Sequence, residues 1–267
     1  MDILETIVAA KRIQVEKFKP LSSIERFEKD GFFWNMTNRS MVQSLLAPAS
    51  TGIISEFKRK SPSKGWFKPK ELEVEKVVVS YNKYAAGISV LTDEEFFGGD
   101  LDDLIQTKVV TDIPVLRKDF IIDKWQIAEA KAFGADVILL IAACLTKNEV
   151  RQFAAYANSI GLESILEIHN EEEAGHICDE VSMVGVNNRN LKTFEVDINI
   201  SLQLINKIPA GKPAISESGI SNADTIVTLK QAGYKGFLIG ENFMKAADPT
   251  IAFDDFVNQL KAKTNED

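Results

Sequence analysis

The sequence predicts a (β/α)8 barrel, and three observations support this fold class. From residue 53 onward, short apolar runs rich in β-branched residues alternate with amphipathic stretches, the pattern of a parallel sheet covered by helices. There are eight such runs, whereas a doubly wound open sheet usually stops near about five or six strands. The length of 267 residues also fits the roughly 250 residues of a complete barrel.

The expected strands cover residues 53–57, 88–91, 114–116, 137–141, 164–168, 183–186, 213–216 and 237–239. Amphipathic helices are expected between them, for example over residues 125–133, 147–160 and 222–232. Each of these three helices is followed by a glycine, namely Gly134, Gly161 and Gly233. Glycine is the residue that a left-handed helix C-terminus favours, so these positions predict where the helices end.

We expect one domain over residues 1–267, since no linker or low-complexity tract interrupts the pattern. Residues 1–50 form an N-terminal helical extension, residues 51–245 form the barrel core, and residues 246–267 form a C-terminal helix. In the extension, Ile3, Ile7 and either Ala10 or Lys11 recur at helical spacing. This spacing predicts a helix that packs against the outside of the barrel.

Composition excludes several classes of function. With 31 basic and 39 acidic residues, the net charge is −8, so we expect neither a nucleic acid nor a membrane as partner. Two cysteines and two histidines are too few for a typical zinc site, and we expect no metal. No apolar run approaches the length of a membrane span, so the sequence favours a cytoplasmic protein with reduced thiols.

Polar residues recur at the ends of the expected strands. In a barrel, alternate side chains point inward, and catalytic groups lie just above the packed core at the carboxyl ends of the strands. A single charged residue there is usually a solvated or paired surface residue, but here five strands carry such residues on the inward face. They are Glu56, Lys58, Lys118, Glu167, Asn187 and Glu217. Their convergence in a dry cavity would shift their pKa values and suit them to acid–base chemistry.

A phosphate site is expected beside them. In such barrels the loops after the last two strands and a helix N-terminus bind phosphate through backbone N–H groups. Ser218 and Gly219 follow the seventh expected strand, and Gly240 and Glu241 follow the eighth. After the first strand, residues 58–65 contain four cationic side chains, which form either a solvated loop or a clamp that closes over an anionic substrate.

The motifs resemble those of the indole-3-glycerol-phosphate synthase family. The first strand and its loop read ISEFKRKSPS over residues 54–63, and five further blocks follow in the family's order along the chain. They are ISVLT with FFGG over residues 88–99, LRKDF over 116–120, EIHN over 167–170, GVNNRNL over 185–191 and SESGI over 216–220.

The resemblance implies roles for individual residues. Lys118 would be the general acid at the substrate ketone, and Glu167 would be the acid or base of a later dehydration. The other implied site residues are Glu56 and Glu217 as supporting carboxylates, Asn187 and Ser218 as orienting groups, Lys58 as a holder of an anionic group, Arg189, Lys60 and Ser61 as lining residues, and Gly219, Gly240 and Glu241 as backbone donors to phosphate. How Lys58, Lys60 and Arg189 share the substrate's carboxylate and phosphate is left open.

The family's reaction requires no cofactor. A 1-(2-carboxyphenylamino)-1-deoxyribulose 5-phosphate closes its ring onto the ketone, loses carbon dioxide and then loses water, with the aryl amine supplying the electrons. We therefore expect a small phosphorylated substrate and no cofactor, and the sequence carries no dinucleotide or P-loop motif. We expect the pKa of Lys118 to be lowered by a neighbouring cation and that of Glu167 to be raised by neighbouring carboxylates.

Two other functions remain possible from the residues. Another phosphate-binding barrel enzyme, such as an isomerase or a Schiff-base aldolase, would share the layout. A non-catalytic binding barrel would have lost acid or base residues, yet Lys118, Glu167 and Glu56 are present. For the oligomeric state we expect a monomer or a weak homo-oligomer.

Overall fold

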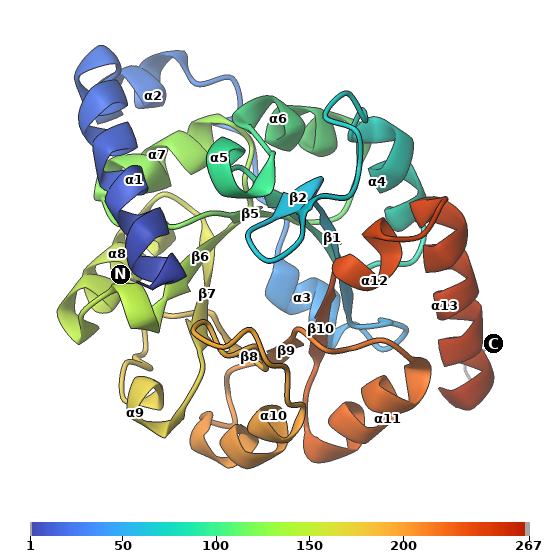
Figure 1. The fold of residues 1–267 in the computed structure, drawn as a ribbon. Helices are drawn as coiled ribbons and strands as arrows, with labels where there is room; N and C mark the ends of the chain where they lie inside the picture. Colours follow the sequence, from blue (N-terminus) through green and yellow to red (C-terminus); the bar gives the residue numbers. More distant parts are fainter. Residues whose placement is uncertain (1, 265–267) are drawn as a thin grey trace.

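The computed structural model describes residues 2–264, and its centre is a closed barrel of parallel strands (Figure 1). The strands are β1 (Ile53–Phe57), β4 (Gly87–Leu91), β5 (Val115–Lys118), β6 (Val137–Ile141), β7 (Glu163–Ile168), β8 (Met183–Asn187), β9 (Ala214–Glu217) and β10 (Gly236–Ile239). Each pairs with its neighbours in chain order, and β10 pairs with β1 to close the ring. The predicted fold class is confirmed, and every expected strand is found within two residues of its expected ends.

Helices surround the barrel. The longer ones are α4 (Glu75–Tyr81), α6 (Leu101–Val110), α7 (Lys124–Ala132), α8 (Lys147–Ser159), α10 (Asn199–Leu204), α11 (Ala223–Ala232) and α13 (Pro249–Thr264). Short helical segments complete the connections: α5 (Glu94–Phe97), η2 (Ala142–Cys144), α9 (Glu171–Ala174), η3 (Ile205–Lys207) and α12 (Glu241–Met244). Gly134, Gly161 and Gly233 have φ angles of 95°, 80° and 115°, which confirms the expected left-handed helix ends.

The inner face of the barrel explains why the polar residues converge. Ile54, Leu116, Ile165 and Ile215 belong to one buried cluster inside the ring. Because side chains two positions apart point to the same face of a strand, the residues that follow them at that spacing also point inward. These residues are Glu56, Lys118, Glu167 and Glu217, and they lie one layer higher, at the carboxyl ends of the strands.

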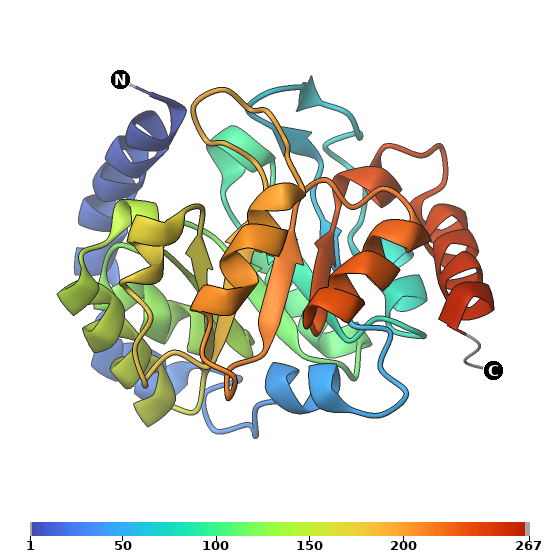
Figure 2. The same ribbon diagram turned by 90° about the horizontal axis from the view of Figure 1, so that it is seen from below.

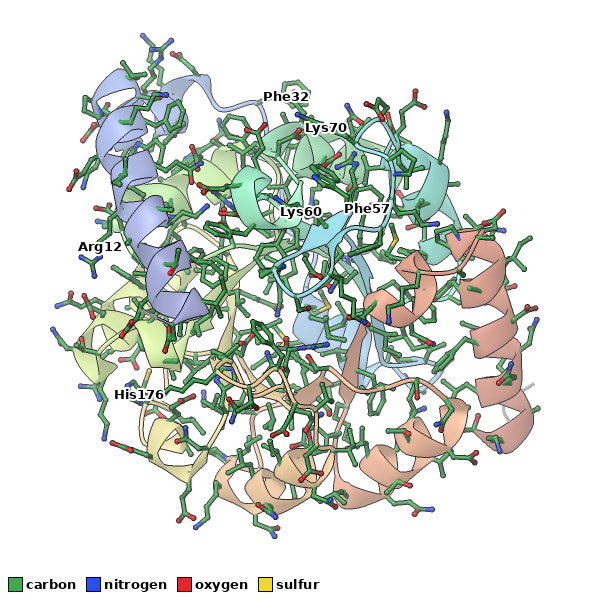
Figure 3. The ribbon with its side chains drawn as sticks, in the orientation of Figure 1. Arg12, Phe32, Phe57, Lys60, Lys70 and His176 are labelled. Carbon is green, nitrogen blue, oxygen red and sulfur yellow. The ribbon has the colours of Figure 1, made fainter. Side chains whose placement is uncertain are left out.

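The N-terminal segment contributes to both ends of the barrel. It forms α1 (Ile3–Phe18), η1 (Lys19–Leu21), α2 (Ile24–Asp30) and α3 (Met41–Leu46). Met41 and Leu45 of α3 join the inner cluster and close the amino-terminal end of the barrel, opposite the loops that follow the strands (Figure 2). The helix α1 packs outside the barrel as expected, and its outer face carries Arg12 (Figure 3). Its first turns reach the mouth of the barrel, which the sequence did not predict.

Three further observations concern the segments outside the ring. The cationic segment after β1 contains a two-stranded antiparallel hairpin, β2 (Lys60–Ser61) and β3 (Gly65–Trp66), in place of an irregular loop. The expected C-terminal helix is α13, while residues 265–267 of that expectation, like residue 1, lie outside the described residues. Within residues 2–264, no helix has the length and apolar character needed to cross a membrane.

Candidate active site

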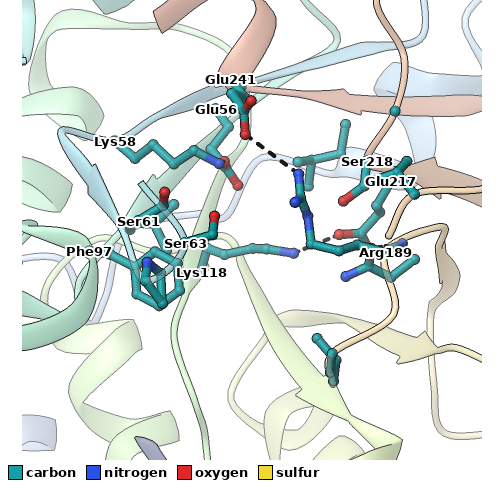
Figure 4. A pocket seen from close by; sticks show the side chains of 18 of the residues that line it. Glu56, Lys58, Ser61, Ser63, Phe97, Lys118, Arg189, Glu217, Ser218 and Glu241 are labelled. Atoms are coloured by element: carbon teal, nitrogen blue, oxygen red, sulfur yellow. Dashed lines mark hydrogen bonds and ion pairs between the residues drawn. The ribbon is translucent and has the colours of Figure 1, made fainter. Parts of the chain in front are cut away.

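A cavity of about 640 Å³ opens at the carboxyl ends of the strands, and it gathers almost every predicted site residue. The predicted residues that line it are Glu56, Lys58, Ser61, Lys118, Glu167, Asn187, Arg189, Glu217, Ser218, Gly219, Gly240 and Glu241. They come from the carboxyl ends of β1, β5, β7, β8, β9 and β10 and from the loops that follow these strands. Figure 4 shows several of them around the cavity. A single concave site with converging polar groups is the usual form of a small-molecule site in this fold.

Lys60 is the exception. Its ammonium group donates to the backbone oxygen of Glu95 at 2.5 Å and lies 5.6 Å from the centre of the Trp66 ring. Consecutive side chains of a strand point to opposite faces, so Ser61 of β2 faces the cavity while Lys60 faces α5. The expectation that Lys60 lines the site is therefore wrong, and in Figure 3 it lies on the hairpin near the mouth.

Lys118 lies at the centre of the polar wall. Its Nζ is 2.6 Å from Glu217 Oε2 and 3.0 Å from Glu167 Oε2, and the first of these contacts is drawn in Figure 4. Burial alone would lower the pKa of this lysine, but Glu167, Glu217 and Glu56 together raise it above the ordinary value. The expectation of a lowered pKa is wrong, because the nearest charges are carboxylates and not cations.

Glu167 is held as a carboxylate by its neighbours. Its Oε1 accepts from Asn187 Nδ2 at 3.1 Å and lies 3.2 Å from His169 Nε2. Although burial raises the pKa of Glu167, Lys118 and His169 outweigh it and lower the pKa below its ordinary value. This direction also reverses the expectation from the sequence.

Glu217 is the carboxyl group whose pKa lies near neutrality. Burial and the neighbouring Glu167 raise its pKa from 4.5 to about 7 against the attraction of Lys118. Its Oε1 is buried without a hydrogen-bond partner among the described residues. A Cβ atom at Gly185 would collide with this oxygen, so the glycine provides the space that the carboxyl group occupies.

Glu56 and Lys58 form the neighbouring pair on β1 and its loop. Lys58 Nζ donates to Glu56 Oε1 at 2.5 Å, and both side chains are largely buried. Gly240 adjoins the Glu56 side chain, which would overlap any Cβ atom at that position. The pair therefore lies between the acid–base groups and the predicted phosphate loops.

A second cluster of charges surrounds Glu241, the first residue of α12. Glu241 forms ion pairs with Lys64 and Lys245, and its Oε2 lies 3.5 Å from Arg189 Nη2. Although burial acts in the opposite direction, Lys245 and Lys64 lower the pKa of Glu241 to about 2. Three cations around one carboxylate leave a net charge of about +2, which matches a phosphate dianion. Lys64 is one of the four cations predicted in the segment after β1, whereas Lys245 was not predicted from the sequence.

The backbone beside this cluster is strained. Ser218 has a φ angle of 68°, in the left-handed region that residues other than glycine rarely adopt, and Gly219 follows at 80°. Asn188, buried beneath the loop, holds the turn by donating from Nδ2 to Ser218 O at 3.1 Å. This turn lines the same cavity as Arg189 and Lys245.

The opposite wall of the cavity is apolar. Phe97 and Phe120 lie there with ring centres 6.1 Å apart, and Ile3, Leu4 and Ile7 of α1 complete this wall. Sequence reasoning missed the contribution of α1, because nothing local in a helix indicates which part of a distant barrel it covers. The wall offers a planar aromatic group an apolar surface.

A buried ion-pair network anchors α1 to the strand that carries Lys118. Lys11 Nζ lies 2.8 Å from Asp93 Oδ2 and 2.8 Å from Asp119 Oδ1, and all three side chains are buried. Asp119 also pairs with Arg117, so the two neighbours of Lys118 in the chain are both fixed. In the sequence, this ion-pair network is indicated only by the charged Lys11, which occupies a position of the N-terminal helix that is expected to face the barrel.

Comparisons with known proteins show the family of the chain. The family model of indole-3-glycerol phosphate synthase matches residues 4–256. The indole-3-glycerol phosphate synthase of Bacteroides thetaiotaomicron is 44% identical over 261 residues, which cover 97% of this chain and 99% of that protein. The one from Variovorax paradoxus is 37% identical over 257 residues, with coverages of 93% and 96%.

Solved structures share the fold at much lower identity. The thiamine phosphate pyrophosphorylase from Pyrococcus furiosus superposes with a TM-score of 0.59 at 15% identity, over 84% of this chain and 98% of that chain. A mutant tryptophan synthase alpha-subunit from the same organism gives a TM-score of 0.59 at 14% identity, with coverages of 79% and 98%. At these identities the likeness shows the fold alone.

Proposed function

The chain belongs to the indole-3-glycerol phosphate synthase family, and from this premise we propose how its residues carry out the reaction. The activity is that of a carboxy-lyase of tryptophan biosynthesis. It closes, decarboxylates and dehydrates 1-(2-carboxyphenylamino)-1-deoxyribulose 5-phosphate to indole-3-glycerol phosphate, carbon dioxide and water. The observation that supports the residue assignment best is the contact of Lys118 with two carboxylates, in a cavity that also contains apolar and cationic side chains.

The substrate lies across the cavity in a defined direction. Its carboxyphenyl ring packs on the wall of Phe97 and Phe120, and its phosphate binds near Arg189 and the backbone N–H groups of Gly219 and Gly240. Lys58 holds the carboxylate of the ring. Position supports this division, because Phe97 and Arg189 lie on different sides of Lys118 (Figure 4).

Lys118 acts first. Its raised pKa keeps it protonated at neutral pH, and it gives a proton to the ketone oxygen as the ring carbon attacks the carbonyl carbon. The electrons of the attacking ring come from the aryl amine, and they return when the carboxylate leaves as carbon dioxide. A positioned proton donor of this kind contributes about 10² to 10⁴ in rate.

Glu167 acts in the dehydration. Its lowered pKa leaves it ionised, so it accepts the carbon-bound proton of the closed ring and passes it to the departing hydroxyl group. Asn187 fixes its orientation through the contact at 3.1 Å. Glu217 and Glu56 support the charge of Lys118, and Ser61 and Ser218 orient substrate hydroxyl groups.

Lys64, from the predicted cationic segment, and Lys245, which was not predicted from the sequence, extend the phosphate site. Together with Arg189 they surround Glu241, which keeps them in place before the substrate arrives. Holding cations in advance lowers the entropy lost on binding.

The setting of the enzyme follows from its substrate. We propose that it works in the cytoplasm, as a monomer or a weak homo-oligomer, with no nucleic-acid or membrane partner. The substrate carries a phosphate and a carboxylate and does not cross an apolar bilayer, so enzyme and substrate share a compartment. The net charge of −8 also disfavours polyanionic partners.

The test is direct. The purified protein is mixed with the carboxyphenylamino-deoxyribulose phosphate, and the fluorescence of the indole product is recorded. We expect turnover without any added cofactor. Absence of product at micromolar enzyme would refute the proposed function.

A further inference from the structure

One buried lysine of α1 joins the two segments that carry the aromatic rings of the apolar wall, and the mechanism above does not use it. Lys11 Nζ lies 2.8 Å from Asp93 Oδ2 and 2.8 Å from Asp119 Oδ1, and the three side chains are 2%, 6% and 1% exposed. Although burial opposes ionisation, Asp119 and Asp93 raise the pKa of Lys11 above its ordinary value. The ammonium group has no directed hydrogen bond to a described residue, so it holds the two carboxylates by charge.

Each of these carboxylates also fixes the backbone that leads to one ring of the wall. Asp93 is the N-cap of α5, the helix that carries Phe97, and its Oδ1 accepts from the backbone N–H of Phe96 at 2.8 Å. Asp119 Oδ1 accepts from the backbone N–H of Phe120 at 2.8 Å. A shift of either carboxylate would therefore shift the ring that follows it. The ammonium group that pairs with both carboxylates fixes the two rings relative to each other.

The two carboxylates depend on Lys11 to different degrees. Asp119 has a second cation, because Arg117 Nη2 lies 3.1 Å from its Oδ2. Within residues 2–264, Lys11 is the only cation that forms an ion pair with Asp93. A buried carboxylate without a countercharge is strongly destabilising. Loss of the Lys11 charge would therefore move Asp93 toward solvent and leave Asp119 in place.

The other end of α5 is held by a contact that does not involve the lysine. Arg59 Nη1 donates to Gly98 O at 3.2 Å, directly after the last residue of the helix. With this end fixed, a movement of Asp93 rotates the helix about Gly98. The rotation changes the angle between the rings of Phe97 and Phe120, which is 33° in the structure.

Resting on the proposed function, we propose that Lys11 is a positioning residue, which fixes the angle of Phe97 against Phe120 and thereby selects the carboxyphenyl ring of the substrate. It does not line the cavity, and it acts through Asp93. The strand that carries Lys118 keeps its other anchor, so ring recognition depends on Lys11 while proton transfer does not. Loss of the lysine charge raises KM with little change in kcat, and it weakens the preference for an unsubstituted ring.

The test compares Lys11→Met with the double variant Lys11→Met/Asp93→Asn. Asparagine caps a helix about as well as aspartate, but it is neutral and needs no cation. Fluorescence of the indole product gives kcat and KM for the natural substrate and for an analogue that carries a methyl group on the ring carbon opposite the amine. One methyl group in an apolar pocket changes kcat/KM by about 10- to 200-fold.

We expect Lys11→Met to raise KM for the natural substrate about 10-fold and to reduce the preference over the methylated analogue about 10-fold, the size of one lost apolar contact. The value of kcat should stay within about twofold of wild type. The double variant should recover both the wild-type KM and the ring preference, because the neutral side chain at position 93 stays at the helix end without its cation.

Lys108→Met is the matched control. The Lys108 side chain is 7% exposed, and its Nζ lies 2.6 Å from Asp136 Oδ1, at the amino end of β6. Its loss should lower the free energy of unfolding in urea and leave KM and the ring preference unchanged. The same urea titration shows whether Lys11→Met is folded, and Lys11→Gln, which keeps a polar side chain, takes its place if it is not.

Three results would overturn this role of Lys11. The first is an unchanged KM and ring preference in the single variant. The second is a double variant that recovers neither, since a packing role of the lysine is not restored by removing the charge of Asp93. The third is a fall in kcat without a rise in KM, which would place the effect at Lys118. Failure of the proposed function looks different, because wild type itself would then make no product from either compound.

Discussion

Glu217→Gln is expected to stabilise the protein at alkaline pH while impairing it as an enzyme. The native environment raises the pKa of Glu217 from 4.5 to about 7, with burial as the largest cause. Between these two values the native state binds more protons than the unfolded state, so stability falls as pH rises through this window. The full difference corresponds to about 3 kcal/mol. Glutamine resembles the protonated carboxyl group and does not ionise, so the variant escapes this loss.

The assay is urea unfolding of both proteins at pH 5 and pH 9, with thermal melts in parallel. At pH 5 we expect nearly equal free energies of unfolding, and at pH 9 we expect the variant to be more stable by about 3 kcal/mol, or about 6 to 12 °C in Tm. Glu71→Gln, at an exposed position, is the control and should show no such pH dependence. A variant equally stable as wild type at pH 9, or less stable, would refute the reasoning. The lower activity of Glu217→Gln would then reflect damage to the fold. It would not show that the wild-type protein gives up stability at this position for the sake of activity.

Three further expectations follow from the same geometry. Gly219→Asp places a side chain against Val196, at a position whose φ angle is 80°, and adds a negative charge near the phosphate site. KM should therefore rise much more than kcat falls. An unchanged KM in steady-state assays would contradict the phosphate assignment. Lys11→Met removes the cation shared by Asp93 and Asp119 and should cost about 3 kcal/mol of unfolding free energy in urea, whereas a loss below 1 kcal/mol would show that the ion pairs are not needed. Dialysis against EDTA should leave kcat unchanged, and a loss that zinc or magnesium reverses would establish a metal requirement.

The fold could be predicted from the sequence because its determinants are local. Each strand is a short apolar run, and glycines such as Gly134 mark helix ends through a backbone preference that acts within a few residues. The convergence of Glu56, Lys118 and Glu167 follows from strand alternation combined with closure of the barrel. Neither step requires knowledge of contacts between distant side chains.

What could not be predicted depends on such contacts. The signs of the pKa shifts of Lys118 and Glu167 were wrong, because each is decided by which charge of the cluster lies nearest. Lys60 was misplaced because the sequence does not reveal the hairpin that turns it toward α5. The ion pairs of Lys11 with Asp93 and Asp119 join segments whose relative position only the folded chain defines.

The central claim is that Lys118 and Glu167 divide the reaction into ring closure and dehydration. Rapid-quench measurement of labelled carbon dioxide against indole product in single turnovers tests it most directly. Lys118→Met should release no carbon dioxide, since the ring does not close. Glu167→Gln should release one equivalent of carbon dioxide per enzyme in a burst, with indole product appearing slower by about 10² to 10⁴. Carbon dioxide and indole product that appear together in Glu167→Gln, with no burst, would contradict the division of labour.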